Sequence, residues 1–231
     1  MHGQNPPAKA ALRAESLCFS YGKRRIVQDL SFSVAPGECA VLAGPNGSGK
    51  STVLSLAAGV LRPTSGTVTA GGRIGYVPQG TALLTDATVE ENLRFFADLA
   101  HADVPAHLPF AVEAYRKQRI SALSGGMQKQ VSIACAMIGD PQILLLDEPC
   151  AALDISFRAE MIALVRTWRQ EGRTVLYAAH DPAEVFLFCD TLIFMGEAPA
   201  VRSRREHPAL WESEAAFAQS FVQLFDKAKS I

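Results

Sequence analysis

The sequence predicts an α/β fold built on a mainly parallel β-sheet. Three short runs, "CAVLA", "ILLL" and "TVLYAA", are almost wholly apolar and alternate with helical patterns. Runs of this kind are typical of parallel strands that are covered by helices on both faces of the sheet. A further sign is the glycine-rich stretch "GPNGSGKS", which follows one apolar strand and precedes a helical pattern.

The first half of the chain reads mainly as strands. Residues 11–22 and 30–38 alternate as two strands around a turn at Gly22 and Lys23, which predicts an N-terminal antiparallel part. Residues 39–44 read as a buried strand and residues 50–61 as an apolar helix. Two further strands with intervening turns are expected within residues 62–79.

The second half mixes helices and strands. Helices are expected at 88–100, 105–118, the segment after Leu123, 158–172 and 208–227, and strands at 142–149, 174–180 and 191–197. The stretch without strands predicts a small inserted helical subdomain of about residues 83–139. Residues 11–82 and 140–231 then form the core of a single domain spanning 11–231, and the Pro-rich residues 1–10 are expected to be disordered.

Composition narrows the function classes. The chain has 231 residues, 48% of them hydrophobic and 19% charged, and a formal net charge of -1. This balance is globular and gives no reason to expect a nucleic-acid partner. The five cysteines form no CxxC pair, and no apolar run reaches the roughly 18 residues of a membrane helix. Any membrane contact is therefore expected through a partner.

The glycine-rich stretch is a phosphate-binding loop. Gly44–Ser51 matches GxxxxGK[ST], in the strand–loop–helix context that this motif requires. Backbone N–H groups of the loop would wrap the phosphates, Lys50 would reach the β- and γ-phosphates, and the Ser51 hydroxyl would reach Mg²⁺.

Two acids end the strand in "ILLLDEP". The strand would deliver them to the phosphate-bearing edge of the sheet, where Asp147 is expected to hold Mg²⁺. Glu148 follows directly, and because side chains alternate along a strand, it is expected to point in a different direction from Asp147. There it would polarise an attacking water.

For three further residues, the neighbouring sequence does not decide between a functional and a structural role. His180 and Gln79 each end an apolar strand, and Tyr21 could either stack on a base or simply pack. "LSGGMQKQ", starting at Leu123, is a second glycine-rich helix start of the kind that binds anions.

Together, these motifs resemble the nucleotide-binding subunits of ATP-binding cassette (ABC) transporters, from about Leu12 to Met195. The resemblance implies site roles at these positions: Tyr21 on adenine; Gly44, Pro45, Asn46, Gly47, Ser48, Gly49, Lys50, Ser51 and Thr52 as Walker A; Gln79 as the Q-loop residue that contacts Mg²⁺ and water; Ser124, Gly125, Gly126 and Met127 as the signature; Asp147 and Glu148 as Walker B and catalytic carboxylate; Asp154 in the D-loop; and His180 on the γ-phosphate.

The resemblance also implies an ATPase that uses ATP and Mg²⁺ and works with integral membrane permease subunits. A second cassette, expected to be another copy of this chain, would complete each ATP site with its signature. The expected location is the cytoplasmic face of the cell membrane, as a peripheral protein. Met127, where the common family motif has Gln, and the segment "TVEENLRFFADL" resemble ABC-2-type and haem exporters.

Three alternatives stay open at this point. An importer subunit fits the same motifs. A soluble ABC ATPase of DNA repair or translation usually carries a coiled-coil insertion or two cassettes, and this chain shows neither. A P-loop kinase or switch GTPase would not explain "LSGGM" together with "LDEP", and no NKxD-type guanine reader is present.

Overall fold

The computed structural model describes residues 11–151, 155–196 and 199–229, and the side chains of these residues up to 224. The predicted mainly parallel sheet is confirmed. Six strands lie in the order β5-β6-β7-β3-β8-β9, and all neighbours are parallel except the pair β8 and β9. Their bounds are Cys39–Ala43 (β3), Ile74–Val77 (β5), Ile143–Asp147 (β6), Thr174–Ala178 (β7), Thr191–Phe194 (β8) and Ala200–Ser203 (β9).

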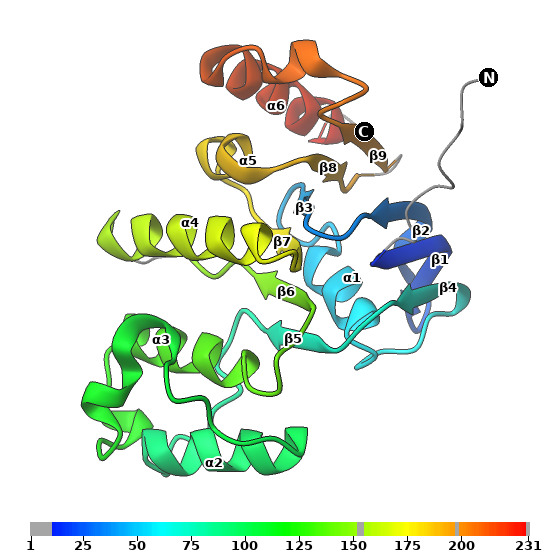
Figure 1. The fold of residues 1–231 in the computed structure, drawn as a ribbon. Helices are drawn as coiled ribbons and strands as arrows, with labels where there is room; N and C mark the ends of the chain where they lie inside the picture. Colours follow the sequence, from blue (N-terminus) through cyan, green and yellow to red (C-terminus); the bar gives the residue numbers. More distant parts are fainter. Residues whose placement is uncertain (1–10, 152–154, 197–198, 230–231) are drawn as a thin grey trace, which may run out of the picture.

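A second sheet of three antiparallel strands carries the N-terminal part. β1 (Leu12–Tyr21) lies between β2 (Arg24–Val34) and β4 (Ser65–Ala70). The turn at Gly22 and Lys23 lies where it was expected, but β2 begins six residues earlier than predicted. Figure 1 shows this sheet beside α1 (Lys50–Ala57), at the opposite side of the molecule from α4.

Alternation along the central strands divides the hydrophobic core into two layers. On β3, Ala40 and Leu42 pack with α1 and the antiparallel sheet, whereas Cys39 and Val41 face the other layer. That other layer includes Met161 of α4 (Ile155–Gln170). Because both faces are covered, every residue of β3, β6 and β7 is buried, as all-apolar strands require.

The insert between β5 and β6 forms a helical lobe with its own cluster of buried side chains, at the lower left of Figure 1. It contains α2 (Val89–Ala100), two 3₁₀ helices (Pro109–Tyr115 and Ile120–Ala122) and α3 (Gly125–Ala136). The prediction of a helix at 105–118 was wrong in type and length, because only a 3₁₀ segment forms there. Phe110 and Ala111 adopt left-handed φ values of 62° and 47°, which interrupt regular helical geometry.

One helix joins this lobe to the core. In α3, Val131, Ala134 and Cys135 pack inside the lobe, whereas Ile133 belongs to the core cluster with Leu144 of β6. Since residues three and four apart share a helix face, α3 presents different faces to the two bodies. The lobe and the core therefore meet along α3.

The C-terminal part contains two elements that the sequence did not predict, α5 (Pro182–Phe188) and β9. The expected helix at 208–227 is divided: a 3₁₀ turn, Pro208–Trp211, precedes α6 (Glu214–Lys229). Ser213 makes the break, because its hydroxyl accepts the Ala216 N–H in the first turn of α6. No helix in the described part of the chain has the length and apolar character needed to cross a bilayer.

A buried amide organises the start of the lobe. Asn92 is fully buried; its Oδ1 accepts the Leu84 N–H at 2.8 Å, and its Nδ2 donates to the carbonyls of Leu84 (3.1 Å) and Thr88 (2.9 Å). Asn92→Leu should lower the free energy of unfolding by about 2–4 kcal/mol, because it removes three hydrogen bonds of a buried amide and leaves the Leu84 N–H without its acceptor, although both carbonyls still accept backbone N–H groups. Thermal unfolding should shift by roughly 5–10 °C. Gln118→Leu, at an exposed position of the same lobe, should leave Tm near wild type, and equal shifts in both variants would contradict this role.

Candidate functional site

A cavity of about 410 Å³ opens between the antiparallel sheet and the C-terminal edge of the central strands. Most of the predicted phosphate, catalytic and aromatic residues surround it. Its lining consists of Tyr21, Arg24, Ile26, Asn46, Gly47, Gly49, Lys50, Ser51, Thr52, Gln79, Glu148 and His180. Residues from five separate stretches of sequence therefore meet at this cavity.

The loop between β3 and α1 can only be built with glycine at two points. Gly44 has a φ of 152°, and a Cβ there would collide with the backbone oxygen of Met195 and lie 2.9 Å from Ser48 Oγ. Gly49 caps α1 with a left-handed φ of 98°, and its Cβ would lie 2.9 Å from Ile26 Cγ2. The loop is thus held tightly against its neighbours, with the N-terminus of α1 facing the cavity, an arrangement suited to phosphate.

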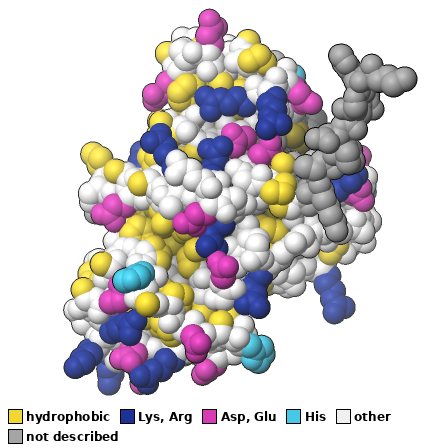
Figure 2. Space-filling view, in the orientation of Figure 1, with side chains coloured by type: hydrophobic (Ala, Val, Ile, Leu, Met, Phe, Trp, Pro, Cys, Tyr) yellow, Lys and Arg dark blue, Asp and Glu magenta, His cyan; other side chains and the backbone are white. Residues whose placement is uncertain are grey.

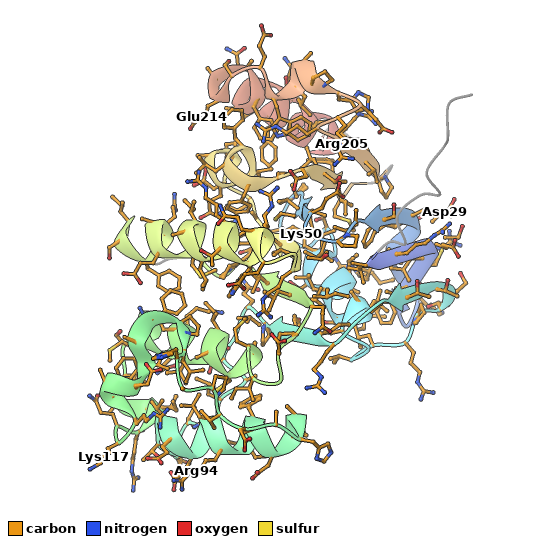
Figure 3. All side chains as sticks on the ribbon, in the orientation of Figure 1. Asp29, Lys50, Arg94, Lys117, Arg205 and Glu214 are labelled. Carbon is orange, nitrogen blue, oxygen red and sulfur yellow. The ribbon has the colours of Figure 1, made fainter. Side chains whose placement is uncertain are left out.

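Lys50 lies at the centre of the molecule (Figure 3). Its side chain is buried, and its Nζ donates to the carbonyls of Gly44 (2.9 Å) and Pro45 (3.2 Å). Glu148 Oε1 lies 3.6 Å from the same ammonium. The positive charge is therefore fixed at the mouth of the loop, where transferable phosphates would lie.

The chemistry around Asp147 fits a magnesium ion. Its Oδ1 is buried and has no hydrogen-bond partner among the described residues. Burial raises the pKa of Asp147, while a hydrogen bond from Ser51 opposes that rise. A buried carboxylate oxygen beside a hydroxyl provides the hard oxygen ligands that Mg²⁺ prefers. Within the described ranges, no cluster of three or more His, Cys, Asp or Glu could hold a metal by itself.

Glu148 faces the cavity for a different reason from the predicted one. β6 ends at Asp147, and Glu148 adopts a left-handed φ of 44°, so strand alternation does not set its direction. Its N–H donates to the Ala178 carbonyl at 3.1 Å, which fixes the turn to the neighbouring strand. The carboxylate is consequently aimed toward Lys50 rather than away from the loop.

The two ambiguous strand-end residues both lie beside that carboxylate. Gln79 Nε2 is 3.5 Å from Glu148 Oε2, and His180 Nδ1 is 3.7 Å from the same oxygen. The chain thus brings an amide, an imidazole and a carboxylate together at the edge of the cavity. Such a set can position a water molecule and contact a phosphate.

Two residues line the cavity at its entrance. Tyr21 is 54% exposed and makes a T-shaped ring contact with Phe19, with ring centroids 4.8 Å apart, while its side chain lines the cavity. Arg24 lies on the same wall. Arg24 was not identified from the sequence, because nothing in its local pattern distinguishes a surface arginine from a cavity-lining one.

The signature residues lie elsewhere. Ser124 caps α3 by accepting the Met127 N–H at 3.2 Å, and a Cβ on Gly125 would meet open space. Among the described residues, none of Ser124–Met127 lines the cavity. The predicted D-loop residue Asp154 lies outside the described residues.

A polar cluster behind His180 was missed at the sequence level. The Tyr177 hydroxyl lies 3.3 Å from Cys150 Sγ and 3.4 Å from Glu184 Oε2. Arg158 bonds to Asp181 at 2.8 Å and approaches Glu184 at 3.3 Å. These contacts support the segment that carries His180. "HDPAE" contains the signal that could have revealed part of it, because Asp181 caps α5 and Pro182 occupies its first turn.

Comparison with known proteins shows one matching family and several similar sequences and structures. The sequence matches the family described as ABC transporter over residues 27–151. It is 37% identical to Nod factor export ATP-binding protein I of Paraburkholderia xenovorans, covering 82% of this chain and 69% of that protein. It is 34% identical to the linearmycin resistance ATP-binding protein LnrL of Bacillus subtilis, covering 84% and 70%.

Solved structures agree on the fold. An inward-facing ABC transporter of the metal-chelate type superposes with a TM-score of 0.74 at 27% identity, covering 86% of this chain and 85% of that one. The ATP binding subunit of an ABC transporter superposes with a TM-score of 0.80, covering 93% and 99%. At 24% identity, this second likeness concerns the fold alone.

Proposed function

This chain belongs to the ABC transporter family as an ATP-binding subunit, and from that premise we propose how its residues bind and hydrolyse ATP. Asn46–Thr52 hold the phosphates, and Lys50 neutralises the charge on the β- and γ-phosphates. The exposed ring of Tyr21 stacks on the adenine ring. The cavity that brings these groups together is the observation that supports this assignment.

Hydrolysis is assigned to the cluster around Glu148. Its carboxylate accepts a proton from the attacking water, while Gln79 and His180, both within 4 Å of the same oxygen, position that water and the γ-phosphate. Asp147, Ser51 and Gln79 are the residues that would hold Mg²⁺, which would supply charge neutralisation at the transferring phosphoryl group.

We further propose that two cassettes share each ATP. The supporting observation is the separation of the two anion-binding helix starts: α1 faces the cavity, whereas the signature residues at the start of α3 do not line it. In a dimer, Ser124–Met127 of one cassette would contact the γ-phosphate held by the other. Charge-assisted contacts across the interface would favour closure, and phosphate release would remove them. The helical subdomain of about residues 83–139 is the part that carries the signature to the partner.

Ser124→Arg tests the shared site. The variant should bind ATP with an affinity within about two-fold of wild type, because Ser124 does not line its own cavity. ATP-dependent dimerisation in a Glu148→Gln background should be lost, because a bulky cation would replace the cap at the interface. Size-exclusion chromatography with light scattering measures the dimer. Ser121→Arg, an exposed position three residues earlier, is the matched control, and undiminished dimerisation of Ser124→Arg would exclude the shared site.

The partners follow from the family. ABC ATP-binding subunits work with membrane permease components, and we propose a homodimer bound to an integral membrane permease at the cytoplasmic face. The surface near Gln79 and residues 83–93 would receive the permease. Figure 2 shows basic and acidic side chains interspersed on one face of the molecule, which gives no support to a nucleic-acid partner.

Export is the proposed direction of transport, because two relatives that are 37% and 34% identical to this chain over the aligned residues are named for export or resistance. The alternative is an importer subunit. Purification of the tagged chain with its permease from native membranes, followed by ATP-driven transport in vesicles of known orientation, separates the two. A co-purifying permease without a solute-binding protein supports export, and dependence on a solute-binding protein would overturn it.

A further inference from the structure

Lys129 lies on the face of α3 that meets the core. It is four residues before Ile133, which packs against the central sheet, so both project from the same side of the helix. The Lys129 ammonium donates to the carbonyl oxygens of Pro78 and Gln79, both at 2.9 Å. One side chain of the signature helix therefore holds two successive backbone carbonyls of the loop that follows β5.

This loop carries a residue of the hydrolysis cluster. Gln79 comes two residues after β5 ends, and its side chain reaches Glu148, which in turn approaches Lys50. A continuous line of polar contacts thus runs from Lys129 on the signature helix to the phosphate-binding lysine. Neighbouring polar side chains on α3 serve other segments: Gln128 donates to the carbonyls of Ile120 and Leu123, and the Gln130 amide accepts the Tyr115 hydroxyl.

The charge of Lys129 suits this position. Partial burial lowers the pKa of Lys129, and the negative charge of Asp147 opposes that shift. The ammonium therefore adds positive charge near the acidic end of β6 while its donors are directed to backbone carbonyls. A neutral side chain of similar length would keep the apolar stem but lose both functions.

We propose that Lys129 is a positioning residue for ATP hydrolysis, which ties the Gln79 loop to the signature helix and thereby keeps the Gln79 amide directed at Glu148. When the signature helix shifts on meeting ATP in the partner cassette, the loop moves with it. This inference rests on the roles proposed above for Gln79 and Glu148, and it adds a contact within one chain that links the two halves of the shared site.

The test compares Lys129→Met, Lys129→Arg and the exposed control Lys117→Met in steady-state ATP hydrolysis by the full chain, with hydrogen exchange of the segment after β5 as a second readout. Lys129→Met should lower kcat about ten-fold, because a small misplacement of a catalytic group is costly, and should leave KM for ATP within two-fold. Exchange in the Gln79 segment should rise. Lys129→Arg should recover most of kcat, and Lys117→Met should behave as wild type.

A double mutant separates a positioning role from general destabilisation. In a Gln79→Ala background, Lys129→Met should change kcat by less than about two-fold, since both substitutions remove the same effect. Independent, multiplying losses would overturn the inference, as would wild-type kcat in Lys129→Met or a lower kcat without increased exchange. Failure of the proposed catalytic assignment would be distinguishable, because Glu148→Gln would then hydrolyse ATP normally whatever the exchange data show.

Discussion

Lys50→Ala should abolish productive ATP binding and, with it, hydrolysis. The variant removes the buried ammonium from the mouth of the loop, where it is held by the carbonyls of Gly44 and Pro45. Each charge-assisted hydrogen bond to phosphate contributes about 1.5–3 kcal/mol, so two such bonds correspond to at least about a hundred-fold rise in Kd. Titration calorimetry with ATP and Mg²⁺ measures this rise directly.

A matched control removes a lysine from the surface. Lys23 lies in the exposed turn between β1 and β2 and does not line the cavity. Lys23→Ala should keep both ATP affinity and kcat close to wild type. Normal ATPase activity in Lys50→Ala would show that Gly44–Ser51 does not bind the substrate phosphates.

Glu148→Gln should leave ATP bound and unhydrolysed. The amide keeps the shape and contacts of the side chain but cannot accept a proton from water, and general-base catalysis contributes about 10²–10⁴-fold. We expect kcat to fall by at least about 100-fold while Kd for ATP changes little. Since ATP then persists at the interface, a closed dimer should accumulate, visible by light scattering after addition of ATP.

The comparison variant is Glu160→Gln, which neutralises an exposed acid on α4. It should retain wild-type kcat and form no ATP-stable dimer. Turnover of Glu148→Gln at the wild-type rate would mean that another group activates the water. Because the charge of Glu148 contributes to the raised pKa of Asp147, the same variant should also lower the Asp147 pKa.

The sequence was sufficient to predict those parts of the structure that depend on a local pattern of residues. Strands buried on both faces are readable as apolar runs, and Gly44–Ser51 is readable because a phosphate loop needs glycine at fixed points. The sequence was insufficient where two distant segments decide the outcome. β9 forms by antiparallel pairing with β8, and its own four residues carry no strong strand pattern.

The candidate site shows the same division. Apart from Arg24 and Ile26, the residues that line the cavity could be anticipated from motifs, but the directions of their side chains could not. Glu148 is aimed by a left-handed turn that is held by a bond to Ala178, thirty residues away in sequence. The hydrogen-bond partners of Lys129 are backbone carbonyl groups, which every residue has. No sequence pattern could therefore predict these contacts.

The backbone conformation of Glu148 determines when the free energy needed to orient its carboxylate is spent. A residue other than glycine with φ near 44° is strained by about 1–3 kcal/mol, and such a conformation persists only where the surroundings enforce it. Here the enforcing groups are the fully buried β6 and the hydrogen bond to β7. The chain therefore meets the cost of orienting its carboxylate once, when it folds. Each molecule of ATP then binds beside a general base that is already oriented, so no reorientation of Glu148 is needed during turnover.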